Sequence, residues 1–460
     1  MKALFRYIIP ALLPVALAAC SGTKGLTPVR LDTPAAVATG ENVVDSASVA
    51  DIDWWKLYTD PSLKYIIEET LRHNRDLEAA AARVQQMYEL YGVSKANFMP
   101  TLSGSVLADN ETNDYHGEPH KSDPEFDLKA TLSWEADLWG GLGWAKKRGL
   151  ANYLESVENA RAMRITLIAE AASAYFRLLA LDNELDIARR TLYTREEYLK
   201  KAKLRFEGGL TPETVYQQAK VEHATTAALI PGLERQIEVQ KNAIALLMGR
   251  FPDEEIFRGK LDFDYDSVTA IPVGIPSQLL QRRPDVRASE AALKSALANV
   301  GVTYADRFPR LRISLTGGLE NDELRGFFQS PFSYVVGSIT GTILDFGRNK
   351  RKYRASIAAY EQSRARYEQC VLNAFREADD AVITFRLVNQ AVERKRELLD
   401  AAGEYTRLAY AQYNMGVINY IDVLDAQRRY FDAQVGFSNA VRDRYLALVN
   451  LYKCLGGGWE

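Results

Sequence analysis

Cysteine and histidine are both scarce in this chain, with 3 cysteines and 4 histidines among 460 residues. Cys370 and Cys454 lie on different predicted helices, so we expect both thiols to be unpaired and find no disulfide framework. His116 and His120 are four residues apart, but Pro119 interrupts the polar loop between them, so the spacing does not bring their rings together. The sequence also has no Gly-x-Ser-x-Gly elbow, no Gly-x-x-x-x-Gly-Lys-Ser/Thr phosphate loop and no zinc-type Cys/His cluster. We therefore expect no catalytic site, no cofactor and no metal site.

The chain also lacks a strong charge bias and, after its leader, a long apolar run. Lys+Arg 57 against Asp+Glu 60 leaves a formal net charge of -3, which gives a nucleic-acid partner no electrostatic support. No later stretch is long and apolar enough for a transmembrane helix. Hydrophobic residues make up 47% of the chain, enough for extensive burial, so it is not a disordered chain. Any membrane crossing would have to use β-strands.

The first twenty residues have the form of an export signal that ends at a cysteine. A short cationic start precedes an apolar run over residues 7–16, and Leu17-Ala18-Ala19 leads into Cys20. Small residues before a cysteine look like a bacterial lipobox, so we predict that Cys20 is lipidated after the signal is removed. Ser21 follows, whereas lipoproteins kept at the inner membrane usually carry Asp there, so we predict an outer-membrane lipoprotein. An ordinary signal peptide with an incidental cysteine is the alternative.

The two halves of the chain resemble each other at an offset of about 207 residues. Glu170-Ala171 falls on Glu377-Ala378, and Gly209 falls on Gly416. Each half is predicted to form a strand, a loop, a strand, a long helix, a tight turn and a returning helix. The predicted organisation is a signal peptide over 1–19, a lipid-anchored linker over 20–50, a first repeat over 51–255 and a second repeat over 256–460.

The predicted strands alternate apolar and polar side chains. From Phe126 to Leu138 every second residue is apolar and the residues between them are polar or charged, which gives one apolar face and one charged face. The predicted strands cover about 101–109, 126–138, 311–320 and 334–344. A soluble sheet packed on one face would show the same alternation. Strands of about ten residues with this alternation also match transmembrane β-strands.

Four strands cannot close a barrel alone. In hydrocarbon, an open sheet edge leaves backbone groups unpaired at a cost of several kcal/mol each. A small barrel needs roughly eight strands or more, so several copies of the chain must contribute. A trimer would supply twelve strands, although the strand count alone does not fix that number.

Two long runs without proline predict unusually long helices. Residues 142–206 contain two glycines near their start, Gly143 and Gly149, and residues 348–414 contain one, Gly403. Roughly 60 residues at 1.5 Å each would extend about 90 Å. Each run ends in a glycine-containing turn, after which a shorter helix returns. This predicts helical hairpins over about 142–248 and 348–455. A soluble coiled coil with a purely structural duty is the alternative.

Five segments, in this order, carry a resemblance to a known family. They are Trp54–Leu63, Trp134–Gly140, Leu280–Ala288, the pair Gly416-Val417 with Val423–Arg428, and Leu455–Trp459. Together they resemble the outer membrane factor (TolC-like) family, and most closely its NodT-type efflux lipoproteins. The Arg282-Arg283-Pro284-Asp285 stretch within them is expected to have a structural role, starting a helix after Pro284.

The resemblance implies a mainly α fold with a β-barrel part. A homotrimer would build a twelve-stranded barrel in the outer membrane and a long α-helical tunnel in the periplasm. It also implies two partners, a periplasmic adaptor protein and an inner-membrane pump, commonly of the resistance-nodulation-division type. Such a duct supplies no chemistry, and its cargo is chosen mainly by the pump, so the sequence does not identify the exported substrate.

The resemblance also implies a gate at the second hairpin turn. Asp422 and Asp425 are three residues apart and share one helix face, where three copies would form a ring of carboxylates that favours cations. Val215 and Gln218 occupy the equivalent places in the first half, so the acidic pair belongs to one hairpin only. A solvated helix face with two ordinary acids is the alternative.

Tyr413 matches a tyrosine that helps to hold the aperture closed in the resembled family, and helix packing is the alternative role. An arginine of the same closing network would fall at Ile418, which cannot make polar links. We therefore expect this tip to be held shut in a different way.

Two other classes of protein remain open at this point. One is a lipid-anchored periplasmic scaffold or adaptor that does not span the membrane. The other is a passive uptake porin, although porin protomers normally carry enough strands to close their own barrels.

Overall fold

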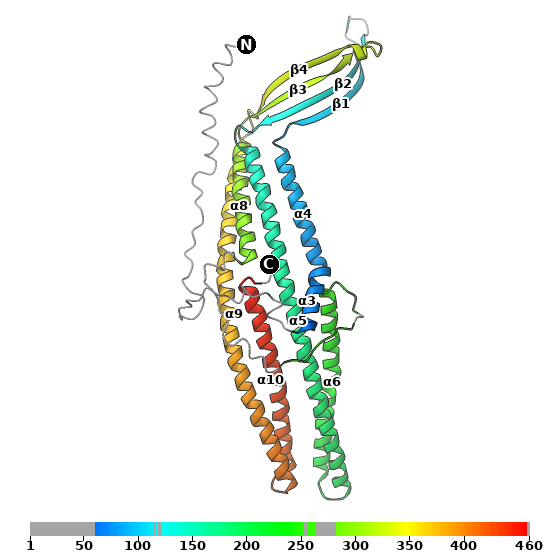
Figure 1. The fold of residues 1–460 in the computed structure, drawn as a ribbon, viewed down its shortest axis with the longest axis vertical. Coiled ribbons are helices and arrows are strands. Elements are labelled where there is room, and N and C mark those ends of the chain that lie inside the picture. Colours follow the sequence, from blue (N-terminus) through cyan, green and yellow to red (C-terminus); the bar gives the residue numbers. More distant parts are fainter. Residues whose placement is uncertain (1–59, 114–115, 118–120, 253–254, 263–281, 458–460) are drawn as a thin grey trace. The chain divides into compact units, whose positions relative to one another are not determined.

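The computed structural model describes residues 60–457 except 114–115, 118–120, 253–254 and 263–281 (Figure 1). The predicted leader, Cys20 and the linker lie outside the described residues. The described chain divides into two compact units. The first unit contains residues 82–157 and 288–369, and the second contains residues 60–81, 158–287 and 370–457. Among the helices described, none has the length and apolar character needed to cross a membrane.

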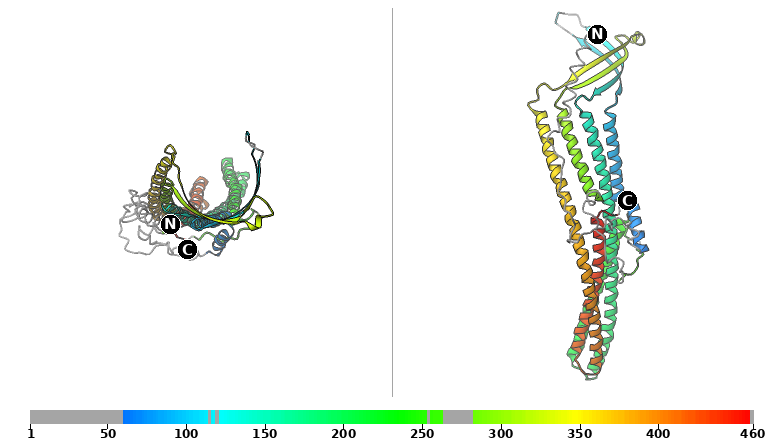
Figure 2. Two further views of the ribbon diagram at one scale, coloured as in Figure 1. Left: turned by 90° about the horizontal axis from the view of Figure 1, so that it is seen from above. Right: turned by 60° about the vertical axis from the view of Figure 1, so that its left-hand side comes forward.

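The first unit carries a four-stranded antiparallel sheet in the order β1-β2-β3-β4. Its strands are β1 (Thr101–Asn113), β2 (Lys121–Ala136), β3 (Arg310–Asn321) and β4 (Pro331–Thr340). Leu128 in β2 lies opposite Val106 in β1 and Leu319 in β3. The sheet is strongly curved (Figure 2), and within this unit β1 and β4 are its two edges.

On β2 the apolar side chains are more exposed than the polar side chains of the opposite face. Leu128, Leu132 and Trp134 are 42%, 40% and 41% exposed, although they belong to the apolar face of β2. On the opposite face Thr131 and Ser133 bond to the matching hydroxyls of β3, at 3.1 Å each. A sheet packed on a soluble core would show the reverse pattern, whereas a sheet that faces lipid shows this one.

Helices continue the first unit below the sheet. They are α4 (Arg75–Ala96), the start of α5 (Gly141–Glu207), α8 (Pro284–Ala305) and the start of α9 (Arg348–Asn414). Asp137 accepts hydrogen bonds from the amides of Leu142 and Gly143, at 2.9 and 2.8 Å, and so caps α5. Helix α8 packs closely on α5, because a Cβ at Gly301 would lie 2.2 Å from the Trp144 ring.

The second unit consists mainly of two helical hairpins. The first joins α5 to α6 (Glu213–Leu247), and the second joins α9 to α10 (Tyr420–Cys454); α3 (Pro61–His73) completes the unit. Helices α5 and α9 have 67 residues each, a length of about 100 Å at 1.5 Å per residue. Phe176 of α5 stacks on Tyr445 of α10 with ring centroids 4.3 Å apart, within the large buried core of this unit.

Both hairpins turn at a glycine in the left-handed region. Gly209 and Gly416 have φ values of 70° and 75°, and each ends a 67-residue helix in the same way. After them, the Leu210 amide donates to Arg205 O at 2.8 Å, and the Val417 amide donates to Gln412 O at 2.9 Å. Glycine adopts this conformation without steric cost, which explains why both turns have a glycine at the same position after the helix.

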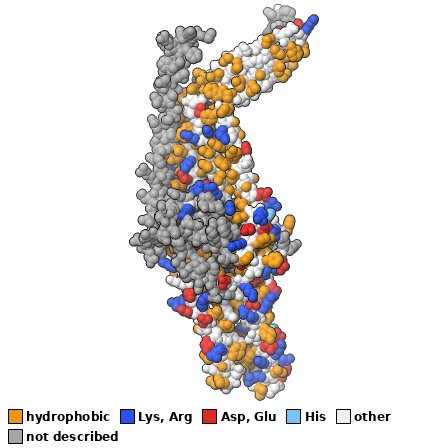
Figure 3. Space-filling view, in the orientation of Figure 1, with side chains coloured by type: hydrophobic (Ala, Val, Ile, Leu, Met, Phe, Trp, Pro, Cys, Tyr) orange, Lys and Arg blue, Asp and Glu red, His pale blue; other side chains and the backbone are white. Residues whose placement is uncertain are grey.

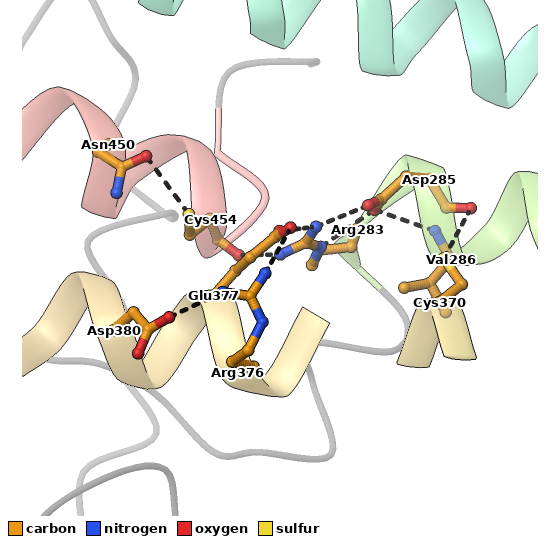
Figure 4. A network of polar contacts seen from close by, with 9 residues as sticks. All are labelled: Arg283, Asp285, Val286, Cys370, Arg376, Glu377, Asp380, Asn450 and Cys454. Carbon is orange, nitrogen blue, oxygen red and sulfur yellow. Dashed lines mark hydrogen bonds and ion pairs between the residues drawn. The ribbon is translucent and has the colours of Figure 1, made fainter. Parts of the chain in front are cut away.

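Within the second unit, Arg283 joins the segment at the start of α8 to α9 and α10 (Figure 4). Its guanidinium donates to Asp285 at the start of α8, to Glu377 of α9 and, at 3.2 Å, to the carbonyl of Cys454 at the end of α10. Only 9% of the Arg283 side chain is exposed. Helix α8 begins at Pro284, as expected, and the predicted structural role of this stretch agrees with these contacts. Among the described residues neither Cys370 nor Cys454 forms a disulfide, as predicted.

Candidate functional site

Asp422 lies in the first turn of α10, directly after the second hairpin turn. Its carboxylate accepts from the backbone amide of Asn419 at 3.1 Å, while the Asn419 side chain caps the amide of Asp422. The two residues form a capping box that satisfies amides left open at the helix start. Asp422 is exposed, and it therefore combines a helix-starting role with an accessible negative charge.

Asp425 lies one turn further along α10 and is half exposed. Its carboxylate accepts from Arg429 Nε at 2.7 Å, and this pairing raises the pKa of the Arg429 guanidinium. Sequence reasoning did not anticipate this cation. The pair is solvent-exposed on both sides, so it contributes little to stability.

Tyr413 lies at the end of α9 and contacts the first hairpin. Its hydroxyl accepts from Arg205 Nη1 at 3.2 Å and lies 3.3 Å from the hydroxyl of Tyr198. Tyr198 in turn stacks on Tyr420 of α10, with ring centroids 3.8 Å apart. Burial raises the pKa values of Tyr198 and Tyr420, so both phenols stay neutral at ordinary pH. Ile418 packs against the same aromatic cluster, where it makes an apolar contact in place of polar links.

An ion cluster centred on a buried carboxylate, which sequence reasoning missed, joins the two hairpins. Glu222 of α6 pairs with Arg195 of α5 at 3.1 Å and with Arg428 of α10. The Arg195 and Glu222 side chains are only 8% and 7% exposed. Arg195 also donates to the Glu222 carbonyl at 3.0 Å and to the Thr226 hydroxyl, which satisfies its remaining donors in part.

The charges in this cluster affect one another. Burial lowers the pKa of Arg195, while the Glu222 carboxylate raises the pKa of Arg428. Two guanidinium groups share one carboxylate, so Glu222 is the residue on which both cations depend. Arg428 belongs to the second hairpin and the other two belong to the first, so the cluster fixes α10 against α5 and α6. Further along the same helices, Asn183 of α5 donates to Ser438 of α10 at 2.8 Å.

One signal for this cluster was present in the sequence. Arg428 ends one of the five segments that carry the family resemblance. The internal repeat could not reveal its partners, because Glu222 falls on Arg429 and Arg195 falls on Ala402 at the repeat offset. At the repeat offset the ion cluster therefore has no counterpart in the other half.

The sheet of the first unit carries a separate charged cluster on its polar face. Carboxylate oxygens of Glu125, Asp127 and Glu320 lie within 4.8 Å of one another. The Lys129 ammonium pairs with Asp127 and lies 3.9 Å from Glu320. A side-chain cation thus already compensates these acids, and the arrangement is an ion-pair network.

Comparison with known proteins identifies the family. The sequence profile described as "Outer membrane efflux protein" matches residues 66–250 and 275–457. The chain belongs to the outer membrane efflux protein family. The predicted fold class is confirmed, since the described chain consists of long helical hairpins with one four-stranded sheet.

Named relatives agree with this assignment. This efflux protein is 30% identical over 417 residues to the toluene efflux pump outer membrane protein TtgF of Pseudomonas putida, covering 89% of this chain and 86% of the relative. It is 30% identical to the probable outer membrane lipoprotein SilC of Salmonella typhimurium, covering 90% and 89% of the two chains. The solved outer-membrane channel OprN superposes with a TM-score of 0.85 at 27% identity, covering 94% of this chain and 99% of OprN.

The family fixes the location and the general role. This protein is an outer-membrane component of efflux, and its role is transport. The family and its channel relatives support the predicted exit duct over the scaffold alternative.

Proposed function

We propose that three copies of this efflux protein form one export duct, which receives substrate from an inner-membrane pump through a periplasmic adaptor. The observation that carries this proposal is the sheet, which exposes its apolar face and leaves β1 and β4 as open edges. Lipid does not tolerate open edges, and pairing β1 of one copy with β4 of the next would remove them. Three copies would then supply twelve strands. We expect the duct itself to catalyse no reaction.

We further propose that Cys20 carries the lipid anchor. Replacing Cys20 with serine removes the thiol to which lipid is attached, so the mature protein is expected to lose its acyl label. Metabolic labelling with a fatty acid, followed by immunoprecipitation, measures this. A Cys370→Ser variant serves as the control and should keep the label. Labelling that persists in the Cys20 variant would refute the anchor.

The gate is proposed to lie at the start of α10, where Asp422 and Asp425 of three copies would place six carboxylates around the opening. Support comes from the exposure of Asp422 and from the contacts that hold Tyr413 against the first hairpin. Arg429 partly offsets Asp425, so we expect Asp422 to carry the larger share of the negative potential.

Single-channel conductance in a planar bilayer tests the gate. The wild-type channel is expected to conduct weakly and to prefer cations, because a ring of carboxylates attracts them and repels anions. An Asp422→Asn/Asp425→Asn variant should lose most of this preference. Asparagine can still accept the Asn419 amide, so this substitution separates the charge from the helix cap.

The matched control removes two exposed acids beside the first hairpin turn, as Glu207→Gln/Glu213→Gln. This variant should keep the wild-type selectivity. Equal behaviour of the two double variants would place the constriction elsewhere, while leaving the duct itself in place.

A further inference from the structure

The first two turns of α9 carry five cations and no acid. Arg348, Lys350, Arg351, Lys352 and Arg354 are all exposed, and the next acid along the helix comes only at position 361. Among the ion pairs between described residues, none involves any of these five side chains. On an exposed helix surface, basic residues normally alternate with acidic residues that screen their charge.

This placement opposes the helix dipole. The N-terminus of a helix carries a partial positive charge, so cations there are unfavourable for the helix. Asp345 already accepts from the amides of Gly347 and Asn349, at 2.9 Å each, so the open amides of this helix end are capped. The five cations therefore serve no purpose in starting α9, and one carboxylate cannot balance them.

The start of α5 repeats the pattern. Asp137 caps the helix, and the exposed Lys146 and Lys147 follow with no acid before Glu155. No ion pair involves either lysine within the described part of the chain. Both helices begin within eight residues of a strand end, since β2 ends at Ala136 and β4 at Thr340.

Aromatic rings lie among these cations. Lys147 Nζ lies 4.3 Å from the ring centroid of Trp144, and Lys146 Nζ lies 5.9 Å from that of Phe98. Trp139 stacks on Phe308 with centroids 4.6 Å apart. Tryptophan and tyrosine gather at the level of lipid headgroups, where one end of the ring is apolar and the other is wet.

The surface of this unit carries both hydrophobic and basic side chains. In Figure 3 hydrophobic side chains cover much of the sheet, and Lys and Arg side chains appear on the helices next to it. The apolar face of the sheet lies in lipid in an outer-membrane protein, so these helix starts lie at the headgroup level on the periplasmic side.

We infer that a basic collar, formed by Arg348, Lys350, Arg351, Lys352, Arg354, Lys146 and Lys147, binds the phosphate groups of anionic phospholipids in the periplasmic leaflet. Guanidinium and ammonium groups form charge-assisted hydrogen bonds with phosphate oxygens. Clusters of four to eight cations beside a membrane segment attract anionic lipid. This inference rests on the outer-membrane location and on the sheet that spans it, and it does not depend on the gate.

Native mass spectrometry of trimers in nanodiscs tests the collar. The nanodiscs contain phosphatidylcholine and phosphatidylglycerol in equal amounts, and the spectrum reports which lipids stay bound. Wild-type trimers are expected to retain mainly phosphatidylglycerol. A Lys350→Gln/Arg351→Gln/Lys352→Gln variant should retain it at least about fivefold less well, since each cation contributes measurably at a membrane surface. Higher salt should release it from the wild type.

The control removes three exposed cations further along the same helix, as Arg386→Gln/Arg394→Gln/Lys395→Gln, and should retain lipid like the wild type. Should the first variant not assemble, Lys350→Arg/Lys352→Arg keeps the charge and must retain lipid. Two results overturn the inference: a wild type with no preference for phosphatidylglycerol, or a collar variant that keeps it. If the wild type shows no lipid preference and the collar variant fails to form trimers, the cations would instead contact a neighbouring copy of the chain. Conductance of the same samples reports separately on the duct.

Discussion

Replacing Glu222 with glutamine is expected to lower the free energy of unfolding by about 3 kcal/mol, because removing one member of a buried ion pair leaves the other uncompensated. Arg195 would then keep its charge in a site where only 8% of its side chain is exposed. Arg428 would lose its ion pair with the first hairpin. Heating detergent-solubilised trimers and following their dissociation on gels measures the loss as a lower midpoint temperature.

The same helix offers a matched control. Glu234 of α6 also pairs with an arginine of α5, Arg189, at 2.8 Å, but the two side chains are 49% and 58% exposed. Exposed pairs contribute about 1 kcal/mol or less, so Glu234→Gln should leave the midpoint nearly unchanged. Similar midpoints for the Glu222 and Glu234 variants would show that burial of the cluster does not matter to the fold.

Replacing Gly249 with alanine is expected to prevent much of the protein from folding, at a cost of at least about 3 kcal/mol. Gly249 follows α6 and has a φ of 71°, a conformation that costs an L-residue about 1–2 kcal/mol. A Cβ there would also lie 2.2 Å from the backbone oxygen of His73, which no side-chain rotation can relieve. The yield of folded trimers and their heat resistance are the measurements.

Gly232 provides the contrast within α6. A Cβ at this position meets nothing within 4 Å, and alanine is favoured over glycine in a helix interior by about 1 kcal/mol. Gly232→Ala is therefore expected to leave the yield and the heat resistance unchanged or slightly improved. A Gly249 variant that behaved equally well would mean that the contact between α6 and His73 adjusts freely.

The long-range architecture could be predicted because its signals are repeated and periodic. Alternation through Leu128 and Leu132 indicated a strand, and the glycine turns at Gly209 and Gly416 marked both hairpins. The ends of the strands were predicted less accurately than their existence, because pairing with the neighbouring strands sets where each strand ends. Polar residues extend β2 back to Lys121, where it still lies opposite β1, and β4 ends at Thr340, opposite the first residue of β3.

The hairpin contacts could be predicted only in part. Sequence placed Tyr413 and the two aspartates near the second turn, where they lie, but their roles stay predictions. The sequence did not show that Arg205, Asn419 and Arg429 are the contact partners of these residues. Those contacts depend on how each helix is rotated and how its end is capped. The Arg195–Glu222–Arg428 cluster joins residues from three helices at separations that no local pattern encodes.

The exposed apolar face of the sheet affects how the protein behaves before it reaches the membrane. Val106, Val335 and Ile339 are 78%, 70% and 75% exposed, and they lie on β1 and β4, each of which pairs with a neighbouring strand of the described sheet on one side only. Such a surface sticks to other chains in water. We therefore expect a newly exported copy to aggregate in water unless this surface is covered before the chain reaches the outer membrane.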